Sequence, residues 1–133
     1  DADIICTTTP SRKPLVKLDW LKKGVHINAI GADAPGKEEL DPKILKKAKI
    51  VVDDIQQAAH SGEINVPLRR GIISLKDIHA SLGEIVSKKK TARESDEITL
   101  FDSTGLAIQD IAIAHAIYKK AEEKKRGYRI NFM

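Results

Sequence analysis

Short apolar runs alternate with helix signals along this chain, and this alternation restricts its fold more than any other feature. Residues 49–54, KIVVDD, form a nearly continuous apolar run of the kind that predicts a strand buried on both faces. The preceding residues 41–48, DPKILKKA, predict a helix, because Asp41 can cap the first turn and proline is tolerated at the first helical position. This order of strands and helices indicates a mostly parallel α/β sheet.

The remaining elements fit the same fold class. Further strands are expected at residues 4–9, 25–31 and 98–101. A short helix or turn is expected at residues 16–24, a helix that stops near Ser61 and Gly62 within residues 54–64, and one helix or two short ones at residues 74–90. Between these elements, Glu38 and Glu39 are expected to open a helix, and the segment around Pro67 and Gly71 is expected to be a surface connection.

A long helix is expected near the end of the sequence. It follows Asp102, Ser103 and Thr104, which compete as its N-cap. Apolar residues lie on more than one side of it, which predicts that the helix is well buried. The final residues 126–133 are expected to form a short tail that contains a possible strand.

Composition and charge disfavour two functional classes. The chain has 133 residues, of which 41% are hydrophobic and 32% charged, as is usual for one globular domain. Its 23 basic and 19 acidic residues are interleaved, and its few aromatic residues do not form basic stacking arrangements, so nucleic acid binding is disfavoured. Because no apolar run reaches the ~18 residues of a membrane span and no export signal is recognisable, we expect a cytoplasmic protein without membrane contact.

Disulfide and metal chemistry are disfavoured as well. Cys6 is the only cysteine, so an internal disulfide cannot form, and we expect this thiol to be inert within a buried strand. The four histidines do not have metal-ligand spacing, and His115 is expected to be buried in the long helix. We therefore expect no metal site.

Polar clusters follow three of the expected strands. They are residues 7–11, TTTPS, after the first strand, residues 31–37, GADAPGK, after the second, and residues 102–105, DSTG, after the last. In open parallel sheets, ligands bind in the crevice beyond the carboxyl ends of the strands. The sequence therefore predicts a ligand site where these three clusters meet.

The second cluster has the most chemical content. Asp33 would project into the crevice, Gly31 and Gly36 would let the backbone approach a ligand, and Lys37 could meet a negative or carbonyl group. Simpler interpretations remain open for each polar residue. Asp33 could cap amides of a turn, and threonines at a strand end or at a helix start are common for structural reasons alone.

Four segments resemble the ornithine cyclodeaminase and mu-crystallin family, and the archaeal alanine dehydrogenases within it are the most similar branch. In chain order they are ADIICTTTPS, NAIGADAPGKEEL, SGEI and FDSTGLAIQD, and the resemblance covers essentially the whole chain. It implies that residues 1–125 are the second half of a Rossmann-like NAD(P)-binding domain. Residues 126–133 would return to a substrate and dimerisation domain that this sequence lacks, and no strand–GxGxxG–helix unit occurs in it.

The resemblance also implies roles for single residues. Asp33 matches the catalytic carboxylate that stands beside the nicotinamide, an acid that mu-crystallins lack. Thr104 matches a position beside the substrate where cyclodeaminases tend to have valine, which argues against ornithine as substrate. The positions that match cofactor contacts are Thr9, Asn28, Ala29, Ile30, Lys37 and Ser103.

The implied activity is NAD-dependent oxidation of a small amino acid, with L-alanine the expected substrate and NADP a possible cofactor in place of NAD. Asp33 would act as a general base, a role that a carboxylate suits only if partial burial in the closed site raises its pKa. The full-length protein would be a homodimer, and the 133-residue chain alone is expected to be inactive. Two alternatives remain open: an ornithine cyclodeaminase, and a non-catalytic NAD(P)H-binding protein like mu-crystallin.

Overall fold

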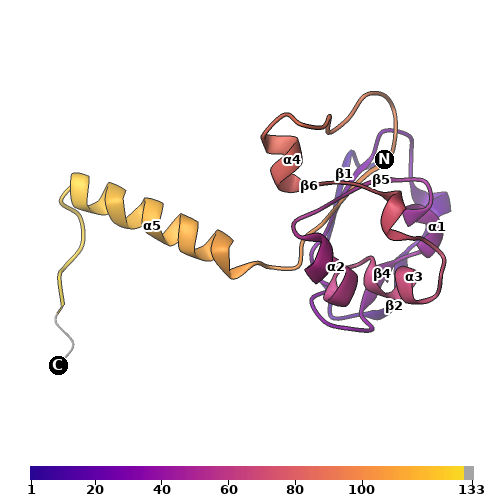
Figure 1. The fold of residues 1–133 in the computed structure, drawn as a ribbon, viewed down its shortest axis with the longest axis horizontal. Helices are drawn as coiled ribbons and strands as arrows, with labels where there is room; N and C mark the ends of the chain where they lie inside the picture. The colour runs from indigo at the N-terminus through magenta and orange to yellow at the C-terminus, as the bar shows by residue number, and fades with distance from the viewer. Residues whose placement is uncertain (131–133) are drawn as a thin grey trace.

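A five-stranded parallel sheet organises the computed structural model, which describes residues 1–130 (Figure 1). Its strand order is β1-β3-β7-β5-β6, and every neighbouring pair is parallel. The bounds are Ile4–Thr7 for β1, His26–Ala29 for β3, Lys49–Val52 for β5, Ile78–Ser81 for β6 and Thr99–Asp102 for β7. The predicted α/β class with a mostly parallel sheet is confirmed.

The other elements are short, apart from the last helix. Two parallel strands, β2 and β4, form a separate small sheet with bounds Arg12–Val16 and Glu38–Leu40. The α-helices are α1 (Pro42–Leu45), α2 (Ile55–Ser61), α3 (Asn65–Arg69), α4 (Leu82–Val86) and α5 (Ala107–Glu123). Two single turns of 3-10 helix cover Leu18–Trp20 (η1) and Leu75–Asp77 (η2).

Local capping explains where the short helices begin. The Asp41 carboxylate accepts a hydrogen bond from Lys43 N at 2.9 Å, and Pro42 occupies the first turn of α1, as predicted. Asp54 caps α2 in the same way, through Gln57 N at 2.8 Å. These caps satisfy backbone N–H groups that have no partner inside the helix.

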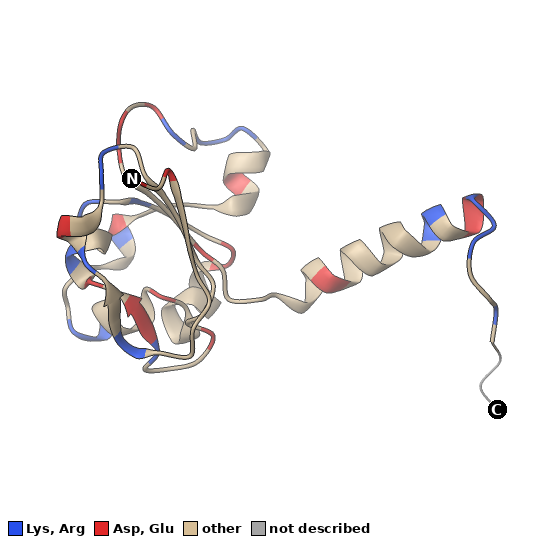
Figure 2. Cartoon of the chain, turned by 180° about the vertical axis from the view of Figure 1, so that it is seen from behind, with Lys and Arg blue, Asp and Glu red and all other residues tan. Residues whose placement is uncertain are grey.

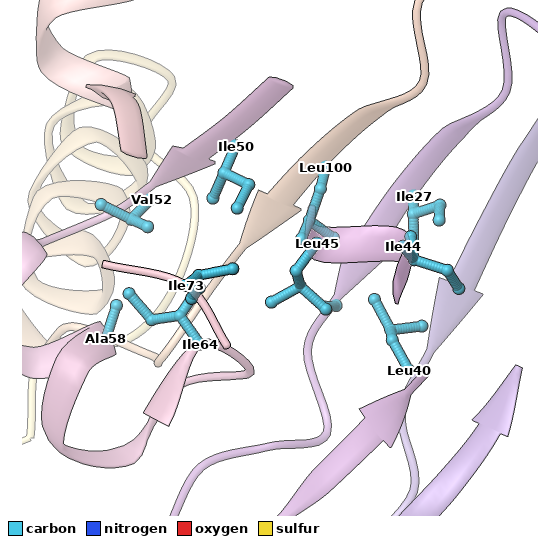
Figure 3. Packing of buried hydrophobic residues seen from close by; sticks show 11 residues of the cluster. Ile27, Leu40, Ile44, Leu45, Ile50, Val52, Ala58, Ile64, Ile73 and Leu100 are labelled. Carbon is cyan, nitrogen blue, oxygen red and sulfur yellow. The ribbon is translucent and has the colours of Figure 1, made fainter. Parts of the chain in front are cut away.

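One face of the large sheet carries the hydrophobic core. Side chains of β3, β5 and β7 pack there against α1, α2 and β4 (Figure 3). The cluster consists of Ile27, Ala29, Leu40, Ile44, Leu45, Ile50, Val52, Ala58, Ile64, Ile73 and Leu100. Burial of these side chains is the main source of stability for a domain of this size.

The opposite face of the sheet is covered only in part. The short helix α4 lies beside it and borders an apolar groove of about 420 Å³. The groove lining includes Asn28 of β3, Val51 of β5 and Phe101 of β7. Cys6 of the edge strand β1 is exposed, because nothing among residues 1–130 covers this end of the sheet, and so the prediction of a buried thiol was wrong.

Three segments differ from the sequence-based predictions. Glu38 and Glu39 lie in the buried strand β4 and do not open a helix. The segment expected as a surface connection contains α3, in which Asn65, Val66 and Pro67 are buried. The segment expected to be helical from residue 74 to residue 90 contains the edge strand β6, because pairing with β5 overrides its helix-like apolar spacing.

The long helix α5 exists as predicted, but its surroundings differ. It begins at Ala107 with Leu106 as N-cap, so none of the three predicted capping residues caps it. It extends away from the sheet and contains no buried residue (Figure 1). His115 is therefore exposed, contrary to prediction, as are the isoleucines of the helix. Residues 126–130 form no strand, and residues 131–133 lie outside the described residues.

Charged residues of both signs occupy the same parts of the surface (Figure 2). The loop after α4 begins with basic residues and ends with acidic ones. Its acidic end is attached to β5, since Lys49 pairs with Glu97 at 2.9 Å and with Glu94 at 3.4 Å. Among residues 1–130, no helix has both the length and the apolar character needed to cross a membrane.

The difference between the packed core and the exposed helix predicts two unlike effects of the same substitution. Ile50→Ala removes a fully buried side chain from a central strand and should lower the free energy of unfolding by about 2–5 kcal/mol. Ile111→Ala, on α5 where the isoleucine is 67% exposed, should change it by less than about 0.5 kcal/mol. Urea denaturation of the chain measures both, and equal losses would mean that α5 packs on the body.

Candidate functional site

The carboxyl ends of the central strands meet at one edge of the sheet. Thr7, Ala29 and Asp102 are neighbours across β1, β3 and β7. The loops that follow stay close to this edge, because Ile30 N donates to Thr7 O at 2.9 Å and Ser103 N donates to Ala29 O at 3.0 Å. The three predicted polar clusters are therefore brought together, and we refer to this region as the site edge.

The loop of residues 31–37 is anchored at both of its ends. Gly31 lies so close to Thr9 that a Cβ atom would overlap the Thr9 backbone, and this explains the glycine without a ligand. At the other end, Gly36 has a φ of +81° and its N–H donates to the buried Asn65 side chain at 3.0 Å. Asn65 also donates to Lys37 O at 3.0 Å, so this loop is held in place between its two anchors.

Asp33 stands in the middle of this loop and forms an ion pair with Lys37. Its side chain is 61% exposed, whereas that of Lys37 is 19% exposed. The hydrogen bond and the charge of Lys37 hold the pKa of Asp33 below its usual value. In this structure the pKa shift of Asp33 is thus opposite to the rise that partial burial in a closed site would produce.

The Glu39 carboxylate joins the first two clusters. It is fully buried and accepts hydrogen bonds from Thr9 N at 2.6 Å and from Gly31 N at 3.0 Å. One carboxylate thus binds the loop after β1 and the loop after β3.

Two further buried carboxylates continue behind Glu39. Glu63 accepts from Leu40 N at 2.7 Å and from Glu39 N at 2.9 Å, and Asp102 accepts from Ile64 N at 3.1 Å. Burial raises the pKa of Glu63 to about 8 and that of Asp102 to about 7, although the backbone N–H donors act in the opposite direction. Oδ1 of Asp102 has no hydrogen-bond partner among residues 1–130.

Asp53, at the end of β5, fixes the third cluster. Its carboxylate accepts from Thr104 N at 2.6 Å and from the Thr104 hydroxyl at 3.0 Å. The next residue, Asp54, caps α2. Thr104 is 7% exposed, and its hydroxyl is already engaged by this hydrogen bond to Asp53.

The predicted site residues fall into two groups. Thr9, Asp33, Lys37, Ser103 and Thr104 all lie in the loops at the site edge. The three residues predicted from β3 and its end lie beside this edge, each in different surroundings. Asn28 lies on the groove face with its amide 3.6 Å from Cys6 Sγ, Ala29 is buried in the core, and Ile30 is 40% exposed just beyond the strand.

Sequence reasoning missed Glu39, Glu63 and Asn65, which hold the site edge from behind. Glu39 was assigned to a helix start, but its position two residues after Lys37 in a β-strand turns its carboxylate toward Thr9. The signal that could have identified these residues is a polar side chain within an otherwise apolar stretch, such as Asn65 between Ile64 and Val66. Among the described residues, no group of three or more His, Cys, Asp or Glu side chains could hold a metal ion.

Comparison with known proteins assigns the chain to a family. The model of the ornithine cyclodeaminase/mu-crystallin family matches residues 1–125. Alanine dehydrogenase of Archaeoglobus fulgidus is 60% identical over 131 residues, which are 98% of this chain and 41% of that protein. The chain thus spans about two fifths of the length of this relative.

Solved structures agree with this assignment. An archaeal alanine dehydrogenase dimer with bound NAD superimposes with a TM-score of 0.90 at 60% identity, over 98% of this chain and 41% of that one. Δ1-Pyrroline-2-carboxylate reductase of Thermococcus litoralis, in complex with NADH and L-proline, has a TM-score of 0.89 at 41% identity, over 97% of this chain and 41% of that one. The resemblance and the fold predicted from sequence are confirmed.

The contact between Gly31 and Thr9 predicts that alanine is poorly tolerated there. A Cβ at position 31 would overlap the Thr9 backbone and lie 2.7 Å from Glu39 Cδ, so Gly31→Ala should lower the free energy of unfolding by about 1–3 kcal/mol. Gly83→Ala is the matched control, because its nearest contact is 3.9 Å away and alanine favours the helix. Thermal denaturation that finds Gly31→Ala as stable as Gly83→Ala would contradict the close packing.

The raised pKa values predict that stability falls as pH rises. Glu63 and Asp102 bind protons more tightly in the folded chain than in the unfolded one. Their ordinary pKa values are 4.5 and 3.8, and in the folded chain these pKa values are about 8 and about 7. Above pH ~5 the unfolded chain has lost these protons, so each group lowers the free energy of unfolding by roughly 1.4 kcal/mol per pH unit until the folded group ionises.

Urea denaturation between about pH 5 and about pH 8 measures this slope. Glu63→Gln, which cannot ionise, should flatten it, whereas Glu123→Gln at an exposed position of α5 should leave it unchanged. A slope that is the same in Glu63→Gln as in the parent chain would show that Glu63 is already ionised in the fold.

Proposed function

The chain belongs to the ornithine cyclodeaminase/mu-crystallin family, and we propose that it is the second half of the nucleotide-binding domain of an NAD-dependent alanine dehydrogenase. The full-length enzyme would oxidise L-alanine to pyruvate and ammonia. The 60% identity to the alanine dehydrogenase of Archaeoglobus fulgidus supports this substrate over others. Residues 1–125 would form the domain half, and residues 126–133 would lead back to a substrate and dimerisation domain.

One structural observation carries this proposal: the loop with Asp33 is fixed at the site edge beside Thr9. The loop is tied to Thr9 through Glu39 and to α3 through Asn65, while the Asp33 carboxylate itself remains 61% exposed. A rigidly held loop that presents an accessible carboxylate suits general base catalysis, since the base must reach a substrate proton. An Asp33 that only capped its own turn would be engaged by backbone amides, and its side-chain partner is Lys37 instead.

The residues present fit one end of a dinucleotide. Thr9 is part-buried at the site edge, where its N–H is bound by Glu39, and Lys37 lies in the neighbouring loop with its side chain 19% exposed. Thr9, Lys37 and Ser103 would hold the nicotinamide end, with Asn28, Ala29 and Ile30 along the strand beside it. A Gly-rich loop for the pyrophosphate is absent from the 133 residues, so this chain would bind only part of NAD or NADP.

A nicotinamide bound beside Thr9, Lys37 and Ser103 would supply a hydride acceptor, so that the substrate Cα could lose a hydride and its amine become an imine. Asp33 would take a proton from the water that adds to this imine, and ammonia and the 2-oxo acid would leave. Lys37 holds the pKa of Asp33 below its ordinary value, which favours the ionised form but makes the carboxylate a weaker base while the ion pair persists. A ligand group that engages Lys37 would free Asp33 and raise its pKa.

A second candidate is reduction of a cyclic imine, favoured by the 41% identity to Δ1-pyrroline-2-carboxylate reductase of Thermococcus litoralis. The same edge would serve, with the hydride moving toward the substrate. Ornithine cyclodeamination fits less well, because Thr104 stands where we expect valine in such enzymes. A binding protein without activity also fits less well, because Asp33 is retained.

The exposed isoleucines of α5 support an assembled full-length protein. Ile108, Ile111 and Ile117 are each more than half exposed, and a soluble enzyme would cover such a surface with another domain or subunit. The related archaeal alanine dehydrogenase is a dimer. We propose a cytoplasmic homodimer, for which the single cysteine is also suitable.

The role of Asp33 is tested by Asp33→Asn in the full-length enzyme. The amide cannot take up a proton, so kcat for L-alanine oxidation should fall by about 10²–10⁴-fold while the Kd for NADH changes by less than about threefold. Asp19→Asn, at an exposed aspartate remote from the site edge, is the control and should leave both unchanged. Steady-state kinetics and NADH fluorescence titration measure these quantities.

Three outcomes would redirect the assignment. Unchanged kcat in Asp33→Asn would remove Asp33 from the chemistry. Turnover of Δ1-pyrroline-2-carboxylate with NADH, but none of L-alanine with NAD, would favour the reductase. NADH binding without turnover of either substrate or of L-ornithine would favour a non-catalytic NAD(P)H-binding protein.

A further inference from the structure

We propose that Glu39 is a positioning residue, whose buried carboxylate sets the separation between Thr9 and the loop that carries Asp33. This inference rests on the proposed function, in which Thr9 contacts the cofactor and Asp33 acts as the base. Glu39 itself would touch neither substrate nor cofactor. Its effect would be transmitted through the two backbone N–H groups that it binds.

The contacts of Glu39 are specific to a carboxylate. Oε1 accepts from Thr9 N at 2.6 Å, and Oε2 accepts from Gly31 N at 3.0 Å. Both side-chain oxygens therefore act as acceptors, each for a different loop. A glutamine has a single acceptor oxygen and would direct its NH2 group at one of the two N–H donors.

The loops have little freedom apart from this clamp. Gly31 touches the Thr9 backbone so closely that no side chain fits between them. Gly31 lies two residues before Asp33, and Asp33 N donates to Gly31 O at 3.1 Å. A shift of Gly31 relative to Thr9 therefore moves the Asp33 carboxylate relative to the proposed cofactor contact.

Glu39 is in turn held by a second carboxylate. Both oxygens of Glu63 accept from Glu39 N, at 2.9 and 3.0 Å, and Glu63 is fully buried. Asp102, at the end of β7, accepts a hydrogen bond from the N–H of Ile64, the residue that follows Glu63. The carboxylates thus form a continuous series behind the site edge, from the loop after β1 to the end of β7.

A purely structural role would not require a carboxyl group at this position. Burying a carboxylate is unfavourable unless it is paired or well hydrogen-bonded, and no lysine or arginine forms a salt bridge with Glu39 among residues 1–130. An apolar side chain, as at Leu40 in the same strand, is the usual solution for a buried strand position. At position 39 the carboxyl group instead joins the two loops of the proposed site.

The adjacent residue in β4 provides a matched control. Glu38 is also buried, at 2% exposure, but its carboxylate pairs with Arg70 at 3.3 Å on the other side of the strand. It has no hydrogen bond to Thr9 or Gly31. Glu38→Gln therefore makes the same chemical change in the same strand without altering the clamp.

The test compares Glu39→Gln with Glu38→Gln in the full-length enzyme. Glu39→Gln should lower kcat for L-alanine by about 10–100-fold, as expected for a displaced catalytic group, and raise the Kd for NADH by about tenfold. Glu38→Gln should leave both within about twofold of the parent. Equal effects of the two substitutions would overturn the proposal.

A double-mutant cycle separates positioning from general destabilisation. If Glu39 acts through the placement of Asp33, Glu39→Gln should lower kcat by less than about twofold in the Asp33→Asn background, where no base remains to be misplaced. Losses that multiply would mean that Glu39 affects turnover independently of Asp33, and the proposal would fall.

Hydrogen exchange tests the clamp without relying on activity. The peptides that contain the Thr9 and Gly31 amides should be protected in the parent and exchange at least tenfold faster in Glu39→Gln, with no change in Glu38→Gln. Absence of protection in the parent would overturn the clamp. If Glu39→Gln does not fold, Glu39→Asp, which keeps the charge but is too short for both donors, is judged by the same measurements.

The two proposals can fail separately. A full-length enzyme that oxidises no amino acid would refute the proposed function, while the exchange rates would still judge the clamp. An active enzyme in which Glu39→Gln matches Glu38→Gln would refute only the role of Glu39.

Discussion

Hydrogen bonds from backbone N–H groups to buried carboxylates hold the carboxyl-terminal edge of the sheet in place. Parallel strands bring their ends to one edge, but the loops that leave them have no ladder partners of their own. Glu39, Glu63, Asp102 and Asp53 supply acceptors for these loops. The geometry of every polar residue at the site edge depends on this arrangement, because each loop is tied to one of these side chains.

The electrostatics follow from the same arrangement. Glu63 and Asp102 are buried near one another, and burial without a nearby cation raises both pKa values. Asp33 is in the opposite situation, since it is exposed and paired with Lys37, which lowers its pKa. The buried side chains of Glu63 and Asp102 thus hold the segments behind the site edge, while the Asp33 carboxylate is exposed at that edge.

Two apolar surfaces of the chain are only partly covered. The groove beside α4 borders the second face of the sheet, and α5 has no buried residue along its whole length. Core packing against α1 and α2 therefore accounts for one face of the sheet only (Figure 3). Under the proposed function, further domains or subunits of the full-length enzyme would cover these surfaces.

Local signals in the sequence were sufficient for the α/β class, for the strand at residues 49–52, for the cap at Asp41, and for the three polar clusters after the strands. Each depends on neighbours in the chain, so a single sequence reveals it. The tertiary structure alone decided that Glu39 lies in a strand, that β6 pairs with β5, and that α5 is exposed. These outcomes depend on contacts between residues far apart in the chain, and apolar spacing or local charge does not encode which partner a segment will meet.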